Sequence, residues 1–227
     1  MTAAANGTSF DHFYSYLTGH LGGGSGVIDR LLQHIGYSIE ALAIGALIAV
    51  PLGLWSGHTG RGATVLSLLS NASRALPTLG LLTIFAILIG VGLNAAIIPL
   101  VFIAIPSILV NSYVAIAGVD RSLVDAAKGM GLTPWQVVRS VELPVGLPII
   151  VLGFRTAAIQ VVSTATIAAY VGLGGLGRFI IDGYASRNYA EIGAGAVTVA
   201  LFAIAVEALF LLGQRLLVSP GVRRAGI

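Results

Sequence analysis

The 227-residue chain is 56% hydrophobic and 9% charged, with a mean hydropathy of +0.95. Soluble domains carry about 25% charged residues, so too few polar side chains are present to cover a surface that faces water, and we expect an integral membrane protein. The net charge of +3 comes from scattered cations, which excludes a basic nucleic-acid-binding stripe, and the lack of cysteine excludes disulfides, thiolate metal sites and cysteine nucleophiles.

The first 30 residues are polar and rich in glycine, and no basic start is followed by an apolar run, so no cleavable signal peptide is expected. A membrane-spanning helix needs about 20 mostly apolar residues. Residues 35–55 form the first candidate span. Residues 76–89 form the second, and an alternative start near residue 63 would place a kink at Pro77.

Residues 75–119 contain no Asp, Glu, Lys, Arg or His, and this stretch is too long for one span. A glycine-containing break at residues 90–94 places the third span at 95–119. The fourth span is predicted at 146–170 and the fifth at 192–215. Uninterrupted apolar runs do not suit the alternating strands of a barrel. The predicted fold class is therefore an all-α bundle of five transmembrane helices.

Lysine and arginine predict the orientation, because they concentrate in cytoplasmic loops. With the N-terminus outside and the C-terminus in the cytoplasm, the outer segments hold Arg30, Arg178 and Arg187. The inner segments then hold eight cations: Arg61, Arg74, Arg121, Lys128, Arg139, Arg215, Arg223 and Arg224. This orientation, in a cell membrane, is the one we expect.

A polar island at residues 120–142 holds six of the chain's charged side chains, which number 12 Lys or Arg and 9 Asp or Glu in all. Ser122 and Asp125 match a capping box with Ser122 as the N-cap, and the helix is expected to end at a glycine C-cap near residues 129–131. Thr133 and Gln136 match a second capping box. The island is thus predicted to be a cytoplasmic elbow of two short helices.

Pro134 stands at the favoured first position of the second short helix. Pro144 and Pro148 are expected to mark the start of the fourth span. Small and apolar side chains of the elbow are expected to pack into a cleft of another protein. These are Ala126, Ala127, Met130, Trp135 and Val138.

The spacing within the island resembles a known family. Asp125-Ala126-Ala127 is followed by three residues, Gly131, nine residues, then Val141, one residue and Leu143-Pro144. This series resembles the EAA loop of ABC importer permeases, with Asp for Glu and Val for Ile. The resemblance covers residues 33–217 and implies a type I permease domain whose coupling loop, 120–144, docks into a groove on a cytoplasmic ATP-binding subunit. For Asp125, helix capping is the plainer alternative to a partner contact, and both roles are compatible.

A narrower resemblance lies in residues 129–136 (GMGLTPWQ), 142–144 (ELP), 153–157 (GFRTA), 164–168 (TATIA) and 172–177 (GLGGLG). These segments are similar to permeases for glycine betaine, carnitine and choline. Methionine and phosphonate permeases share the TPWQ and glycine-rich segments. The GFRTA and TATIA segments favour the osmoprotectant branch, and the methionine and phosphonate solutes remain the alternative.

Two charges lie within predicted spans, and charges in lipid are usually paired and functional. Arg155 and Glu207 are each about 12–13 Å along their helices from the predicted inner ends, so their depths match and we expect an ion pair. The alternative is that each faces a watery cavity or extends to the interface. Ser163, Thr164 and Thr166 are candidate pathway residues, although bonding to their own helix backbone is the preferred interpretation.

The glycines of residues 172–177 are expected to turn the chain between the fourth and fifth spans, because no strand or Lys-Ser/Thr pair accompanies them as a phosphate loop requires. No histidine spacing suggests a metal site. We expect an extracytoplasmic segment at 1–32 and a cytoplasmic tail at 218–227. The chain carries no nucleotide motif, so it is expected to bind no cofactor and to be no enzyme itself.

The family resemblance implies the partners. ATP and Mg are expected on cytoplasmic ATP-binding subunits, and an identical or paralogous permease subunit is expected to complete the path. A fused binding domain is absent from the sequence, so a separate extracytoplasmic solute-binding protein is expected. The alternative from another class is a membrane scaffold whose elbow docks a cytoplasmic signalling protein.

Overall fold

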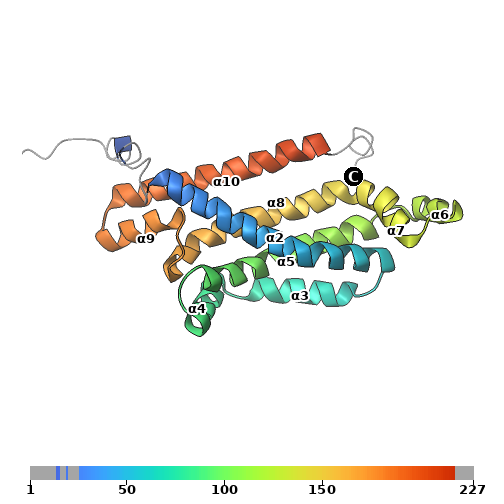
Figure 1. Ribbon diagram of the computed structural model, residues 1–227, viewed down its shortest axis with the longest axis horizontal. Helices are drawn as coiled ribbons and strands as arrows, with labels where there is room; N and C mark the ends of the chain where they lie inside the picture. Colours follow the sequence, from blue (N-terminus) through green and yellow to red (C-terminus); the bar gives the residue numbers. More distant parts are fainter. Residues whose placement is uncertain (1–13, 16–18, 20–25, 218–227) are drawn as a thin grey trace, which may run out of the picture. The chain divides into compact units, whose positions relative to one another are not determined.

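The computed structural model describes residues 14–15, 19 and 26–217, and the regular elements of this part are all helical (Figure 1). The expected all-α class is confirmed. The expected tail 218–227 and most of the expected segment 1–32 lie outside the described residues. In chain order the elements are α2 (Val27–Thr59), α3 (Ala63–Ala75), α4 (Thr78–Ile89), α5 (Leu93–Ala117), α6 (Arg121–Gly129), α7 (Pro134–Val137), the π-helical η1 (Val138–Glu142), α8 (Leu143–Ala168), the 3₁₀ turn η2 (Ala169–Val171), α9 (Gly177–Ser186) and α10 (Tyr189–Leu217).

Among the described residues, four helical segments are long and apolar enough to cross a membrane. They are Val27–Thr59, Leu93–Ala117, Pro134–Val171 and Tyr189–Arg215. They correspond to the first, third, fourth and fifth predicted spans, so a membrane protein is confirmed. The second predicted span, residues 76–89, corresponds to α4, which has only 12 residues, and the count of five spanning helices is not confirmed.

The alternative version of the second span, which starts near residue 63, is divided at Pro77. The residue before a proline avoids the helical region, and Leu76 is extended, with φ −76° and ψ 128°. The chain therefore breaks into α3, of 13 residues, and α4, of 12 residues. A helix of 12 residues is about 18 Å long, which is shorter than the ~30 Å hydrocarbon core of a bilayer. The predicted kink is thus a complete interruption.

Glycines end the helices where the sequence predicted breaks. Gly90 and Gly92 separate α4 from α5 with φ of 91° and 128°, values that only glycine adopts without strain. Gly172 and Gly175 turn the chain after η2 with φ of 84° and 82°. The ten-residue α9 then follows before α10, and the sequence analysis did not anticipate this helix.

The chain forms two compact units. One comprises Met1–Glu40, Thr78–Pro99 and Val162–Ile204, and the other Ala41–Pro77, Leu100–Val161 and Ala205–Ile227. We refer to them as unit 1 and unit 2. The polar island belongs to unit 2, so the contacts that support it lie within that unit.

Glycines bring α2 close to α5 in unit 2. A Cβ added at Gly53 would lie 2.5 Å from the Ser112 Cβ, and one added at Gly57 would lie 2.6 Å from the Ile116 Cβ. Real Cβ atoms do not approach so closely, so only glycine allows this distance between the helices. The two contacts advance together along both helices, which shows that α2 and α5 run parallel here.

Glycines of α8 make the same kind of approach to α5. A Cβ at Gly146 would lie 2.7 Å from the Ala115 carbonyl oxygen, and one at Gly153 would lie 2.6 Å from the Asn111 Cβ. The contacts advance in opposite directions, so α8 is antiparallel to α5. Small residues of this kind let membrane helices gain close van der Waals contact and also carry helix association in lipid. In unit 2, α5 is therefore fixed between α2 and α8.

We expect Gly57→Ala to lower the free energy of unfolding by about 1–3 kcal/mol, because the added methyl group forces α2 away from Ile116. The matched control is Gly36→Ala, in the same helix, where an added Cβ meets nothing within 4 Å. The control should leave stability unchanged or raise it by up to about 1 kcal/mol, since alanine favours helix. Thermal unfolding of the purified protein in detergent measures both. Equal effects of the two substitutions would contradict the close approach.

Candidate functional site

The polar island lies where α5 ends and α8 begins, and its first helix is capped by Asp120 (Figure 1). The Ser122 backbone N–H donates to Asp120 Oδ1 at 2.9 Å. The same N–H lowers the pKa of Asp120, with a further contribution from the Ser122 side chain. The predicted capping box with Ser122 as N-cap is therefore wrong. Asp120, two residues before Ser122, accepts the Ser122 N–H and is the N-cap. Asp125 therefore lies in the middle of α6 and not in a cap.

The first helix ends at Gly131, as the sequence predicted. Gly131 has φ 85°, its N–H donates to the Lys128 carbonyl, and the Leu132 N–H donates to the Ala127 carbonyl. This pair of hydrogen bonds around a left-handed residue is a Schellman motif. The motif fixes the direction in which the chain leaves α6.

The second capping box is confirmed. Gln136 Oε1 accepts the Thr133 backbone N–H at 2.8 Å, the Gln136 N–H donates to Thr133 Oγ1 at 3.4 Å, and Pro134 is at the start of the helix. The elbow therefore has a defined boundary at each end of the turn between α6 and α7.

The expectation of a second short helix that ends before the fourth span is wrong. The helical segment runs from α7 through η1 into α8 without interruption, and the Leu143 N–H donates to the Val138 carbonyl across the π turn. Pro144 has no N–H, and its ring crowds the carbonyl one turn earlier, so a wider turn just before it accommodates the proline. Pro148 lies inside α8 rather than at its start.

The elbow has a hydrophobic core of its own. Val119, Val124, Ala127 and Val137 are buried together, with Leu132, Val141 and Val145 packed against them. Ala127 is 1% exposed because α6 contacts α7 and η1 on that side. Its small side chain thus serves contact within the elbow. Of the remaining motif residues, Leu143 is half-buried and Pro144 is exposed.

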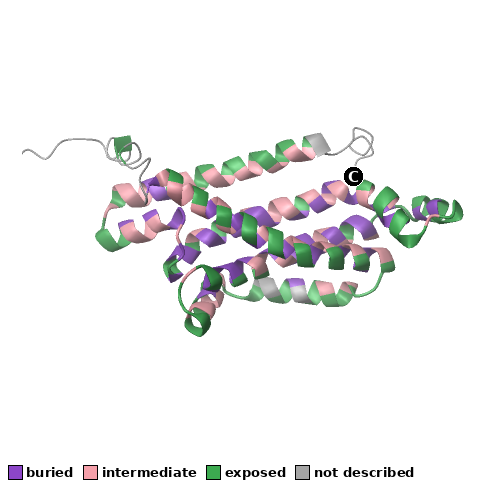
Figure 2. Cartoon of the chain, viewed as in Figure 1, coloured by how far each residue is buried: buried purple, intermediate pink, exposed green. Residues whose placement is uncertain are grey.

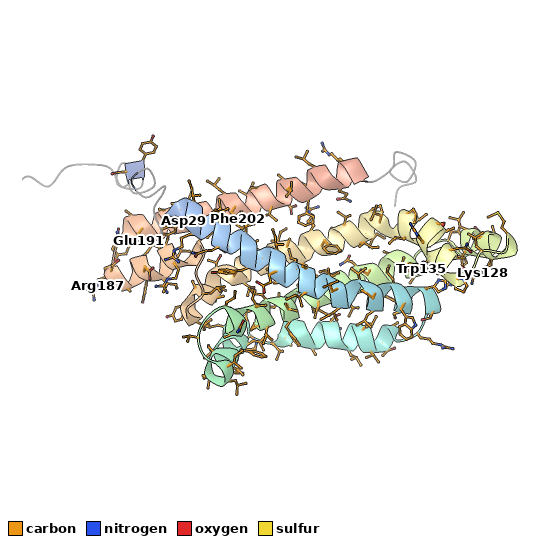
Figure 3. All side chains as sticks on the ribbon, in the orientation of Figure 1. Asp29, Lys128, Trp135, Arg187, Glu191 and Phe202 are labelled. Carbon is orange, nitrogen blue, oxygen red and sulfur yellow. The ribbon has the colours of Figure 1, made fainter. Side chains whose placement is uncertain are left out.

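Figure 2 shows exposed residues on the elbow, and several of them are large and apolar. Met130 is 75% exposed, Trp135 67% and Leu123 48%, and Asp125 and Ala126 are exposed beside them. Figure 3 shows Lys128 on α6 and Trp135 on α7 at the same end of the unit. Val138, which was expected to reach a partner, is buried together with Ala127.

A hydrogen bond between two side chains joins the elbow to α2. His58, in the last turn of α2, places Nδ1 at 2.8 Å from Oε2 and 3.0 Å from Oε1 of Glu142, the last residue of η1. The Glu142 side chain is 3% exposed and the His58 side chain 18%. Sequence reasoning missed this pair. The one signal in the sequence was Glu142 itself. It stands between Val141 and Leu143, in a segment that must pack against neighbouring helices, and a buried acid needs a partner.

A cavity of about 380 Å³ lies beside this pair, between α2 and the start of the elbow's second helix. His58 is the ionisable residue on its wall. The lining residues are Val50, Pro51, Leu54, Trp55, His58, Pro134, Trp135 and Val138.

The structure brings Arg155 and Glu207 together. Arg155 Nη2 donates to Glu207 Oε1, while Oε2 of Glu207 is buried without a hydrogen-bond partner among the described residues. A role of this pair in the membrane stays a prediction. Thr166 Oγ1 donates to the Val162 carbonyl of its own helix at 3.2 Å, Thr164 is buried and Ser163 is exposed. A pathway role for these three residues also stays a prediction.

In unit 1, two side chains of α2 hold the glycine turn after η2. Gln33 Oε1 accepts the Gly175 N–H at 3.0 Å. The fully buried His34 accepts the Leu176 N–H on Nδ1 at 3.3 Å and donates from Nε2 to the Val162 carbonyl at 3.0 Å. The partners thus define a neutral imidazole that uses both nitrogens. The sequence analysis found the turn but not these contacts.

Residues 49–224 match the family described as binding-protein-dependent transport system inner membrane component. The chain belongs to this family. The match includes the whole elbow. The EAA spacing predicted a permease subunit of an ABC importer, and the family match confirms this prediction.

Individual relatives agree with this assignment. The choline transport system permease protein OpuBB of Bacillus subtilis (strain 168) is 37% identical over 201 residues, which cover 88% of this chain and 93% of that protein. The glycine betaine/carnitine/choline permease OpuCB of the same organism is 36% identical, covering 84% and 88%. A solved inward-facing MetNI methionine ABC transporter superposes with a TM-score of 0.73 at 26% identity, over 83% of this chain and 94% of that one.

Gly131→Ala is expected to destabilise the elbow by about 1–2 kcal/mol, because a residue with a Cβ is strained at φ 85°. Gly129→Ala is the matched control, since Gly129 is helical and an added Cβ there meets nothing within 4 Å. Hydrogen exchange of residues 121–143 measures the local effect. Faster exchange in Gly131→Ala alone is the expected result, and equal exchange in both variants would contradict the Schellman assignment.

Proposed function

We propose that the elbow, residues 120–144, is the surface on which a cytoplasmic ATP-binding subunit docks. The observation that carries the proposal is a compact elbow with its own core that exposes Ala126 and the large apolar side chains of Leu123, Met130 and Trp135. Large apolar side chains gathered on an otherwise polar protrusion are typical of a protein-binding surface. The EAA spacing of Asp125 to Pro144 gives independent support. Close contact between the partner and Ala126 requires a small side chain at position 126.

The remaining assembly follows from the family. ATP and Mg are bound by the partner, which performs the hydrolysis, and this chain converts the partner's closure into movement of its helices. A second permease subunit, identical or paralogous, completes the path, and an extracytoplasmic binding protein delivers the solute. The greater number of cations on the elbow side supports a C-terminus in the cytoplasm and an N-terminus outside.

We propose a quaternary-ammonium osmoprotectant, such as choline, glycine betaine or carnitine, as the solute. The names of the relatives OpuBB and OpuCB support this class. The GFRTA segment, residues 153–157, and the TATIA segment, residues 164–168, support the same branch. Methionine is the second candidate, and the likeness to the MetNI transporter favours it.

Ala126→Arg tests the docking surface. The exposed arginine should remove the ATP-binding subunit from the purified complex, because a long cation replaces a methyl group where the partner must make close contact. Ala185→Arg, at an exposed position of α9, is the matched control and should leave the complex intact. Copurification and ATPase activity are the measurements. A complex that survives Ala126→Arg with full activity would show that the elbow does not dock the ATPase.

The solute is tested on the binding protein that copurifies from the native membrane. Calorimetry should show binding of at least one of choline, glycine betaine and carnitine, and no binding of methionine at the same concentration. The same quaternary-ammonium compound should compete with labelled solute for uptake into proteoliposomes that contain the complete transporter. Uptake of methionine that these compounds leave unaffected would assign the second candidate.

A further inference from the structure

Glu142 is a buried carboxylate with a hydrogen-bond partner on another helix. Its side chain is 3% exposed, and both oxygens lie within 3.0 Å of His58 Nδ1. A carboxylate buried without a partner is strongly unfavourable, so the elbow keeps this position only while His58 is present. His58 itself stands in the last turn of α2. The pair therefore fixes the end of α2 to the elbow.

The chain itself also connects the elbow to the spanning helices, to α5 at its beginning and to α8 through η1 at its end. A π turn has poorer geometry than an α turn and often marks a functional site within a helix. Glu142 is the last residue of this turn, so its hydrogen bond with His58 holds η1 at the point where it meets α8. A displacement of the elbow can thus reach α8 through the chain and α2 through His58.

The helix α2 is in turn fixed to α5 by the close approaches at Gly53 and Gly57. Gly57 and His58 are neighbours in the sequence, so the His58–Glu142 contact and the close approach to α5 lie in the same turn of α2. A displacement of α2 at His58 therefore also displaces α5, because the two helices are in close contact at Gly57. This arrangement makes the end of α2 a second point of transmission into unit 2.

We propose that His58 and Glu142 are positioning residues that transmit the displacement of the elbow to α2, and so set how much transport each ATP hydrolysed produces. The proposal rests on the proposed function of the elbow as the ATPase docking surface. It assigns the pair a role in coupling that is separate from docking, because both side chains face the interior of unit 2 and not the exposed surface around Ala126.

The first measurement is solute taken up per ATP hydrolysed by the complete transporter in proteoliposomes. His58→Ala and Glu142→Gln should each lower this ratio by roughly tenfold while the ATP-binding subunit still copurifies. The double variant should lose no more than the more severe single variant, since both remove one interaction. His58→Gln should restore part of the ratio, because an amide N–H can donate to Glu142. Asp182→Asn, which removes an acid from the half-buried Arg178–Asp182 pair in unit 1, is the control.

The second measurement uses the chain's tryptophans, of which it has two. Trp55 lies on α2 and Trp135 on the elbow, and both line the cavity beside His58. With 5-fluorotryptophan in the permease subunit alone, a non-hydrolysable ATP analogue should shift both fluorine resonances of the wild-type complex. In His58→Ala and Glu142→Gln the Trp135 resonance should still shift, and the Trp55 resonance should not.

The outcomes separate the two proposals. If neither resonance shifts in the wild type and no ATP-binding subunit copurifies, the docking function is overturned. The coupling role of His58 and Glu142, which rests on it, is then overturned as well. If both resonances still shift in His58→Ala and Glu142→Gln and the uptake ratio equals that of the wild type, the coupling role of His58 and Glu142 alone is overturned. Loss of the ATP-binding subunit from these two variants would overturn it as well, since the pair would then maintain the docking surface itself.

Discussion

The close approach of α2 and α8 to α5 is the interaction on which unit 2 depends. Lipid provides little hydrophobic driving force between helices, so their association relies on van der Waals contact at short range. Gly53 and Gly57 of α2 provide this contact with α5, and Gly146 and Gly153 of α8 provide it as well. The elbow begins at the end of α5 and returns the chain into α8. Its position is therefore set by the three helices that the glycines hold together.

The elbow combines local and tertiary determinants, and the sequence revealed them unequally. The Thr133–Gln136 box and the Gly131 motif were predicted because the residues that decide them lie within a few positions of one another. The start of α6 was misplaced because Asp120 and Ser122 compete for the same role, and the earlier acid prevails. The continuity of η1 with α8 was missed, since prolines normally indicate a helix start and a π turn has no clear sequence signature.

Contacts between distant residues were harder to foresee. Arg155 and Glu207 were paired in advance because their depths in the membrane could be compared, and the structure places them in contact. His58 and Glu142, which are 84 residues apart, lie at helix ends where no such comparison applies. The contacts of Gln33 and His34 with the glycine turn were missed for the same reason. The sequence showed where the chain would turn, but only the structure shows which side chains hold the turns.

The π turn also determines the rotational setting of the elbow. In an α-helix one residue corresponds to about 100° of rotation about the axis, and a π turn amounts to one additional residue within the helix. The presence of η1 between α7 and α8 therefore rotates the surface that carries Trp135 by a large angle relative to the face of α8 that meets α5. A relative with a regular α-helix in this segment would direct the same motif residues toward a different side of the bundle. The length of the segment between Thr133 and Pro144 is thus as much a part of the coupling motif as the identities of the residues within it.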